Sequence, residues 1–381
     1  MKVKSFEDLI EEVHKKGICQ QCGGCVSFCN SMDYDVIGYK EPNYPPEFIN
    51  EENCLKCGIC YHICPQTHVL DHDLNKSFNL LDFSSMPLGN TSDIYSCQSI
   101  DYDLLHQGTD GGVVNSLLSY MFQENLIDGA IVAKTTAPFS REPFFAECKD
   151  DLVGTSGLKL GISQQLDEVQ KCHSYSSSLP ELNKHKFKKL AVVGTPCQIY
   201  TIRSMQNLGI IPSHNIEYCL GLFCYENFEF DQRKVERFER EFNIKFEDIE
   251  KINIKKDLII QLKGDKNRDS LIHIHFEDLK DYIRPACNAC SDFTNLYADI
   301  SFGGLGSPEK FTTVITRTEK GRLLINNALK SGIISNLDLD SEAEKHMKDL
   351  LIGYSVSKMA RKESFMKTKF GSLKKVKTYS L

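Results

Sequence analysis

The chain contains two matching stretches, Cys19-Gln-Gln-Cys22-Gly-Gly-Cys25-Val-Ser-Phe-Cys29 and Cys54-Leu-Lys-Cys57-Gly-Ile-Cys60-Tyr-His-Ile-Cys64-Pro65. Each follows the spacing C-x2-C-x2-C-x3-C, and the second ends in Cys-Pro. Such short spacings let three thiolates surround one iron–sulfur cube, and the glycines let backbone amides approach its sulfurs. Zinc sites usually take four ligands as two pairs, so two runs of four favour iron–sulfur clusters over zinc.

This spacing resembles that of bacterial two-cluster ferredoxins, in which the fourth cysteine of each run binds the other run's cluster. We expect one 4Fe–4S cluster to be bound by Cys19, Cys22, Cys25 and Cys64. We expect the second cluster to be bound by Cys54, Cys57, Cys60 and Cys29. Asn30 replaces the proline that would follow the first run, which leaves the ligands intact and changes only the turn.

Composition and charge narrow the class of protein. The chain has 381 residues, of which 41% are hydrophobic and 25% charged, as in ordinary soluble proteins of two or three domains. No apolar stretch approaches the roughly eighteen residues of a membrane span, and the first residues lack the apolar core of a signal peptide, so a cytoplasmic location is expected. The 16 cysteines are therefore expected to stay reduced, and the net charge of −7 argues against nucleic acid as a partner.

The chain divides into three expected parts: residues 1–88 with an N-terminal helix and the two-cluster ferredoxin domain, 89–335 as a cofactor domain, and 336–381 as a helical, basic tail. Ser5 can cap a helix over 5–16, which Gly17 ends. After Pro65 a polar linker is expected up to Leu88. The basic residues from Lys358 to Lys377 are expected to form a solvated helical end.

Periodicity in the second part predicts a mixture of strands and helices. Strands are expected at 128–134, from 189 into a tight turn before Cys197, at 215–223, 250–254, 257–263, 270–275, 299–302 and 312–316. Helices are expected at 111–125, 197–205, 230–242, 319–331 and 340–360. This order indicates a mixed α/β, or α+β, fold. The segment Gln107-Gly-Thr-Asp-Gly-Gly precedes the helix over 111–125, whose bare N-terminal amides would suit a phosphate or pyrophosphate.

Eight further cysteines lie outside the two runs. Cys197 and Cys224 follow strands, and Cys287-Asn-Ala-Cys290 lies in a polar loop, so these four could hold a third 4Fe–4S cluster or a zinc ion. The remaining four are expected to be free thiols: Cys97, Cys148, Cys172 and Cys219.

Residues 107–332 resemble the coenzyme F420 hydrogenase/dehydrogenase beta-subunit family. The matching stretches include Gly194-Thr-Pro-Cys-Gln, Gly221-Leu-Phe-Cys-Tyr-Glu-Asn-Phe and Ala298-Asp-Ile-Ser-Phe-Gly-Gly-Leu-Gly-Ser-Pro-Glu-Lys-Phe. The resemblance implies one FAD, one 4Fe–4S cluster and a site for the deazaflavin F420. It also selects Cys197, Cys224, Cys287 and Cys290 as the ligands of the third cluster.

A set of residues is expected to contact the flavin: Thr109, Asp110, Gly111, Gly112, Asn115, Gly157, Lys159, Ser163 and Thr195. The family tends to read Ala-Gly-Thr-Lys-Tyr where this chain has Ser156-Gly-Leu-Lys-Leu160, which puts the shape of the flavin pocket and the identity of the hydride donor in question. Gly303, Gly304 and Gly306 would allow close backbone approach, and Asn227 could donate to a cluster sulfur.

The chemistry requires no acid or base from the chain, so no catalytic residue is assigned. Lys310 and Arg317 are candidates to attract the anionic tail of the deazaflavin. The expected function is electron transfer between reduced F420 and a partner protein or complex through FAD and three 4Fe–4S clusters, in either direction. Two alternatives are a ferredoxin-dependent flavoprotein that reduces a small organic substrate and a relay protein without flavin. The ferredoxin module also resembles F420H2 dehydrogenase input subunits, which would place the chain at a membrane face without spanning it.

Overall fold

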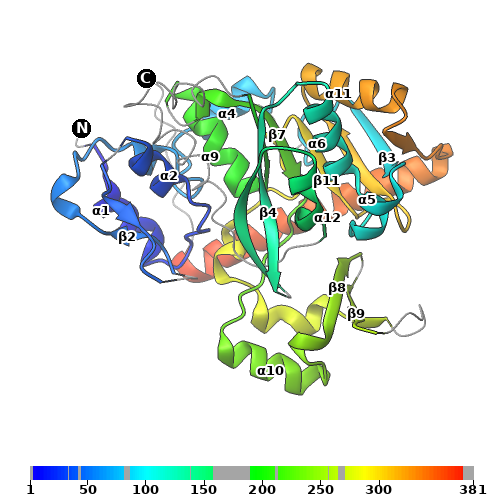
Figure 1. The fold of residues 1–381 in the computed structure, drawn as a ribbon. Coiled ribbons are helices and arrows are strands. Elements are labelled where there is room, and N and C mark those ends of the chain that lie inside the picture. The colour runs from blue at the N-terminus through cyan, green and yellow to red at the C-terminus, as the bar shows by residue number, and fades with distance from the viewer. Residues whose placement is uncertain are drawn as a thin grey trace.

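The computed structural model describes residues 3–32, 34–41, 44–80, 86–137, 139–157, 189–210, 213–255, 257–264 and 271–371. Three regions are visible in Figure 1: a cysteine-rich N-terminal region, a large central sheet with helices, and a small sheet beside it. None of the helices in these described ranges is long and apolar enough to cross a lipid bilayer.

The central sheet has eight strands in the order β13-β3-β12-β11-β7-β6-β4-β5 within the described residues. The strands are β3 (Asp93–Ser99), β4 (Gly129–Ala137), β5 (Ser140–Ala146), β6 (Leu190–Gly194), β7 (Ile216–Leu222), β11 (Ile300–Gly303), β12 (Thr312–Thr316) and β13 (Ile334–Asn336). The inner strands β4, β6, β7 and β11 run parallel, and the outer strands add to them antiparallel.

The sheet is covered on both faces because successive side chains of its strands point to opposite sides. In β6, Ala191 and Val193 belong to a core with α6 (Val113–Gln123) and α11 (Glu319–Lys330). Leu190 and Val192 belong to a second core with α4 (Asp71–Ser77) and α9 (Pro196–Asn207). All five residues of β6 are buried, which explains its continuous apolar sequence.

The small sheet is antiparallel, in the order β10 (Ile272–Ile274), β9 (Leu258–Leu262), β8 (Ile249–Ile254). It packs with α10 (Gln232–Phe242) around an aromatic core that includes Phe238 and Tyr282. Short 3-10 segments adjoin this unit at Phe246–Asp248 and Phe276–Tyr282, and two others, Ser213–Asn215 and Pro285–Ala289, lie elsewhere in the chain. This unit lies to one side of the large sheet, below it in Figure 1.

The N-terminal region consists of short elements around its own core. They are α1 (Phe6–Leu9), a π-helical turn (Ile10–His14), α2 (Gly24–Ser31), β1 (Ile37–Gly38), β2 (Glu47–Phe48), a 3-10 turn (Glu51–Asn53) and α3 (Ile59–His62). Gly23 and Gly58 precede α2 and α3 in the left-handed conformation, at the same place in the two cysteine runs. The repeated geometry agrees with the repeated spacing of the sequence.

The last helix, α12 (Ser341–Phe370), connects these regions. With 30 residues it is about 45 Å long. Met347 and Leu351 pack near the large sheet against Phe293 and Ile315. At its other end Phe365 joins the N-terminal core, and Figure 1 shows the helix running from the large sheet to that region.

Most expected elements are present, with several differences. The helix expected at 340–360 extends to Phe370, and α5 (Tyr102–Gln107), β3, β5, β13 and the 3-10 segment Asp150–Thr155 were not specified by the sequence patterns. The expected polar linker after Pro65 contains α4, because Leu70 and Leu74 are buried against α9. The expectation of a solvated basic tail is wrong at Lys358, which is 1% exposed.

Candidate functional site

A cavity of about 960 Å³ opens at the carboxyl ends of the parallel strands β6 and β7. Thr195, Phe223 and Cys224 follow these strands directly and line the cavity. Its wall is completed by the N-terminus of α6, by the end of β8 and by α12. Ligand sites of open α/β sheets lie at this edge, where strand ends meet loops.

The N-terminus of α6 reaches the cavity through the loop from Gly108 to Asn115. Gly112 precedes the helix with a φ of +66°, and a Cβ there would lie 2.5 Å from the Leu104 carbonyl oxygen. Only glycine fits this turn, which leaves the first amides of α6 free of a side-chain cap. The site is therefore electrostatically suited to an anionic group.

Asp110 and Lys255 form an ion pair of 2.8 Å between the large-sheet region and the small sheet. Lys255 also donates to the carbonyl oxygen of Gly304 at 2.9 Å. A Cβ on Gly304 would lie 2.2 Å from an Asp110 carboxylate oxygen, so a larger residue here would displace that carboxylate. Burial raises the pKa of Asp110, and the Lys255 ammonium opposes that rise.

Asn115 holds the loop that closes one side of the cavity. Its amide donates to the Leu152 carbonyl oxygen at 3.1 Å and to the Ser156 hydroxyl at 2.8 Å. Ser156 and Gly157 both line the cavity beyond that loop. Asn115 therefore shapes the site as well as lining it.

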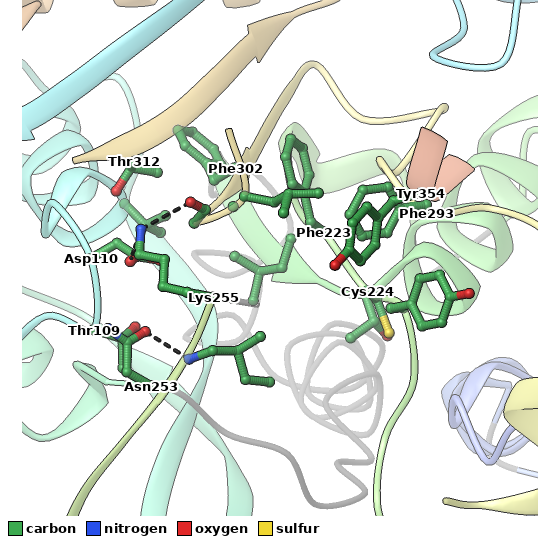
Figure 2. Close-up of a pocket in the computed structure, with 18 of the residues that line it drawn as sticks. Thr109, Asp110, Phe223, Cys224, Asn253, Lys255, Phe293, Phe302, Thr312 and Tyr354 are labelled. Carbon is green, nitrogen blue, oxygen red and sulfur yellow. Dashed lines mark hydrogen bonds and ion pairs between the residues drawn. The ribbon is translucent and has the colours of Figure 1, made fainter. Parts of the chain in front are cut away.

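Aromatic side chains cover the part of the cavity nearest Cys224. Phe223 and Phe293 have ring centres 5.4 Å apart, and Phe293 and Tyr354 have centres 5.8 Å apart. Figure 2 shows Asp110 and Lys255 at one end of the drawn group and Cys224 at the other. The cavity thus has a charged end and an aromatic end, and the aromatic end adjoins a cysteine.

Cys224 belongs to a group of four cysteines contributed by distant parts of the chain, of which Cys287 is buried and the other three are half-buried. Besides burial, the groups that raise the pKa of Cys224 include the Cys287 and Cys290 thiols, and those that raise the pKa of Cys197 include the Cys224 and Cys290 thiols. Burial raises the pKa of Cys224 to about 12 and also raises that of Cys197. The cavity thus reaches, through Cys224, the four residues that the resemblance selected.

Donors and cations surround this group. The backbone N–H of Asn227 lies 3.3 Å from the Cys287 sulfur, and its side-chain amide lies 3.8 Å from the Cys224 sulfur. Arg141 lies on β5 and lines the cavity. Burial lowers the pKa of Arg141 to about 10, against the opposing effect of Cys224 and Cys197.

The group also lies next to the N-terminal region. The largest charge effect on Cys197 comes from Cys22, and the Cys22 sulfur is 3.5 Å from the Thr201 hydroxyl on α9. Arg284, just before the Cys287 loop, donates to the Cys19 carbonyl oxygen at 2.8 Å. Two separate contacts therefore connect the two cysteine-rich regions.

The eight N-terminal cysteines gather in a crossed arrangement. Burial raises the pKa of Cys64, and the Cys22 and Cys19 thiols of the other run add to that rise. The thiol of Cys29 has Cys54 and Cys57 as neighbours, again from the other run. Burial raises the pKa of Cys29 to about 11 and that of Cys60 to about 12. The fourth cysteine of each run therefore lies beside cysteines of the other run.

The remaining residues expected to contact the flavin or the deazaflavin lie in different places. Among the proposed flavin contacts, Lys159 and Ser163 fall outside the described residues, and Gly111 does not line the cavity but donates to the Thr312 hydroxyl at 2.9 Å. Arg317 is 4% exposed and donates to the Leu88 and Thr294 carbonyl oxygens, so it supports the fold rather than a ligand. Lys310 is exposed and does not line the cavity.

Sequence reasoning missed Arg141, Lys255 and Lys358. Arg141 lies in a stretch for which no element was expected, Lys255 lies between two expected strands, and Lys358 lies in a basic stretch. Nothing local distinguishes these cations from surface residues, because each is brought to the site by strand or helix packing.

Comparison with known proteins agrees with this geometry. Two family models, both described as "Coenzyme F420 hydrogenase/dehydrogenase, beta subunit", match the chain: the one for the N-terminal part of that protein matches residues 94–169, and the one for its C-terminal part matches residues 187–342. Together they define a class of redox-enzyme subunits with the mixed α/β fold and large sheet described above. The chain belongs to the coenzyme F420 hydrogenase/dehydrogenase beta-subunit family.

Two curated relatives and one solved structure illustrate the likeness. A coenzyme F420-dependent sulfite reductase from Methanocaldococcus jannaschii is 30% identical over 86% of this chain, which spans about half, 49%, of that protein's length. A coenzyme F420 hydrogenase subunit beta from Methanococcus voltae is 28% identical over 67% of this chain and 87% of its own. A chain of the F420-reducing [NiFe] hydrogenase complex from Methanosarcina barkeri superimposes with a TM-score of 0.64 and 26% identity, covering 74% of this chain and 94% of that one.

Proposed function

We propose that this chain is an electron-transfer subunit that exchanges electrons between reduced coenzyme F420 and a partner protein, through FAD in the cavity and three 4Fe–4S clusters. The observation that best supports this proposal is that the cavity and the cysteine groups adjoin one another in a series. The cavity is lined by Cys224, the group of Cys224 includes Cys197, and Cys197 adjoins Cys22 of the N-terminal region.

The cavity suits a flavin in size and chemistry. Its volume of about 960 Å³ lies at the upper end of the range for small-molecule sites. The amides at the start of α6 would hold the pyrophosphate, while Phe223 and Phe293 offer an apolar wall for the ring. Thr109, Gly157 and Thr195 line the cavity and remain proposed contacts, as do Lys159 and Ser163 from outside the described residues. Bound FAD exchanges electrons in pairs with a deazaflavin and singly with an iron–sulfur cluster.

The cysteines suit clusters better than single ions. Four thiolates on one zinc would lie roughly 3.8 Å apart, from Zn–S bonds of about 2.3 Å in a tetrahedron. Within the part of the chain that is described, no three or more His, Cys, Asp or Glu side chains are close enough to hold one metal ion. A cube binds each thiolate through a separate iron and so accepts wider spacing. We therefore favour a 4Fe–4S cluster on Cys197, Cys224, Cys287 and Cys290, beside the two ferredoxin clusters.

The relatives support the assignment of F420 and of a partner. The names of both curated relatives refer to coenzyme F420, one as a hydrogenase subunit and one as a sulfite reductase of which this chain spans about half. We propose that the partner meets the N-terminal region near Cys57, which is exposed, whereas Cys60 is buried. That place lies at the far end of the series of sites from the cavity.

The test is anaerobic purification followed by rapid mixing with reduced F420. We expect about twelve irons per chain, from three clusters, together with extractable FAD. Reduced F420 should bleach the flavin absorbance before the cluster absorbance falls. Controls use NADH in place of F420, which should leave the flavin oxidised.

Three outcomes would contradict the proposal in different ways. Flavin that reduced F420 does not bleach would favour the reductase of a small organic substrate. Clusters without flavin would favour a relay protein. About eight irons per chain together with bound flavin would contradict only the proposed third cluster.

A further inference from the structure

Lys358 is a buried cation at the cysteine group formed by Cys197, Cys224, Cys287 and Cys290. It lies on α12, beyond residue 342, where the match to the family description ends. Its side chain is among the largest fully buried ones, with 1% exposure. Its ammonium donates to the Asp292 carbonyl oxygen at 2.6 Å and to the Cys224 carbonyl oxygen. The charge is therefore fixed beside the backbone of a proposed cluster ligand.

No carboxylate of the described residues lies within ion-pair distance of this ammonium. The nearby Asp292 carboxylate instead accepts N–H groups from Asn295 at 2.8 Å and Leu296 at 3.0 Å. Arg361, one turn further along α12, differs because it is paired with the Glu226 carboxylate and stacked 4.3 Å from the Tyr225 ring. Lys358 therefore differs from Arg361, because its only direct partners among the described residues are two neutral carbonyl groups.

A buried charge normally has an opposite charge close by, because removal from water is otherwise too costly. The acidic groups that act on the Lys358 ammonium are the Cys290 and Cys224 thiols and the Asp292 carboxyl, and the Asp292 carboxylate is already bound by two backbone N–H groups. The two cysteines would therefore supply the counter-charge for this ammonium when they are deprotonated as cluster ligands. Four thiolates around an iron–sulfur cube supply such a negative charge, whereas four neutral thiols would not.

We propose that Lys358 is a positioning residue that holds a fixed positive charge against the third cluster and raises its reduction potential. A nearby cation stabilises the more negative, reduced form of a cluster, so the cluster accepts an electron from the flavin more readily. The effect is strong because burial keeps water and salt from screening the charge. This inference rests on the proposed function, since it needs the cluster to be present.

The test is a redox titration of the purified holoprotein followed by electron paramagnetic resonance. The signal of the third cluster is identified as the component missing from Cys290→Ala. Lys358→Gln keeps a donor for the two carbonyls but removes the charge, and Lys358→Met removes both. We expect each to shift the redox equilibrium of that cluster at least tenfold toward the oxidised form, which is about 59 mV for one electron.

Two controls separate charge from packing. Lys358→Arg keeps a cation and should leave the reduction potential of the third cluster close to that of the unmodified protein. Lys348→Gln removes an exposed charge from the same helix and should leave the equilibrium unchanged, because water screens it.

An unshifted midpoint in Lys358→Gln, with the cluster signal intact, would overturn the inference alone. Loss of the third signal from the Gln, Met and Arg variants alike would overturn it in favour of a purely structural role. Absence of the signal from the unmodified protein would instead overturn the proposed third cluster and this inference with it.

Discussion

The Lys255 ammonium lies 2.8 Å from the Asp110 carboxylate, which joins the end of β8 in the small sheet to the loop before α6. Both side chains are mostly buried, with 19% and 14% exposure. This pair fixes the position of the small sheet over the cavity. It also places a compensated acidic group where the phosphates of a cofactor are proposed.

We expect the Asp110–Lys255 ion pair to contribute to the free energy of unfolding. The raised pKa of Asp110 means that the folded chain binds this proton more tightly than the unfolded chain, so ionisation lowers stability as pH rises through that pKa. Lys255→Met removes the opposing charge and should cost about 1–3 kcal/mol at pH 7, and less at pH 5. Denaturant unfolding at the two pH values measures this difference.

The double variant is the control for this pair. Lys255→Met with Asp110→Asn leaves no buried charge unpaired and should be more stable at pH 7 than Lys255→Met alone. A double variant whose loss equals the sum of both single losses would show that the two side chains do not interact.

The third cysteine group should control iron content. Cys290→Ala should lower the iron from about twelve to about eight per chain and leave the FAD bound, because Cys290 does not line the cavity. Cys148→Ala is the matched control, since Cys148 is exposed and lies outside the three proposed cluster sites. Iron and flavin are measured on the same anaerobic preparation. Equal iron in both variants would rule out Cys290 as a ligand.

Gly304 should control flavin affinity. Alanine there would place a Cβ 2.2 Å from an Asp110 oxygen, so Asp110 must move and the charged end of the cavity must change. We expect Gly304→Ala to weaken FAD retention about tenfold or more. Gly353→Ala, also at the cavity but in open space on α12, should retain FAD and stabilise the helix by about 0.5–1 kcal/mol. Dialysis against flavin-free buffer distinguishes the two, and equal loss would contradict the steric argument.

His14 should make the N-terminal region sensitive to acid. Burial lowers the pKa of His14 to about 4, with Glu47 opposing this effect. A depressed histidine pKa means that the unfolded chain takes up the proton first, so stability is lost as pH falls from about 6.5 toward 4. His14→Leu should weaken this dependence and keep the apolar contact with Phe6.

The measurement is the guanidinium midpoint for cluster bleaching between pH 7.5 and 5. His68→Leu serves as control, because His68 is exposed and paired with Asp71. An identical pH profile for His14→Leu and the unmodified protein would assign the acid sensitivity to other groups.

The local patterns in the chain predicted much of its architecture. The apolar run from Leu190 to Gly194 indicated a buried strand, and the two cysteine runs of equal spacing have left-handed glycines, Gly23 and Gly58, at the same place. A helix over 111–125 was also expected from local residues, and the structure begins it after Gly112 and ends it at Gln123. In contrast, β5 and β13 lie at or near sheet edges, where little periodic signal is needed for pairing.

The sequence by itself determined which sulfurs are available and how they are spaced, because cluster geometry depends on neighbours only a few residues apart. Only the tertiary structure decided that α12 passes both the cavity and the cysteine group, and that Lys358 is buried there rather than solvated. The local sequence around a lysine does not distinguish an exposed position on a surface helix from a buried position in a core. Its surroundings come from segments more than sixty residues away, such as Cys224 and Asp292, which only folding brings together.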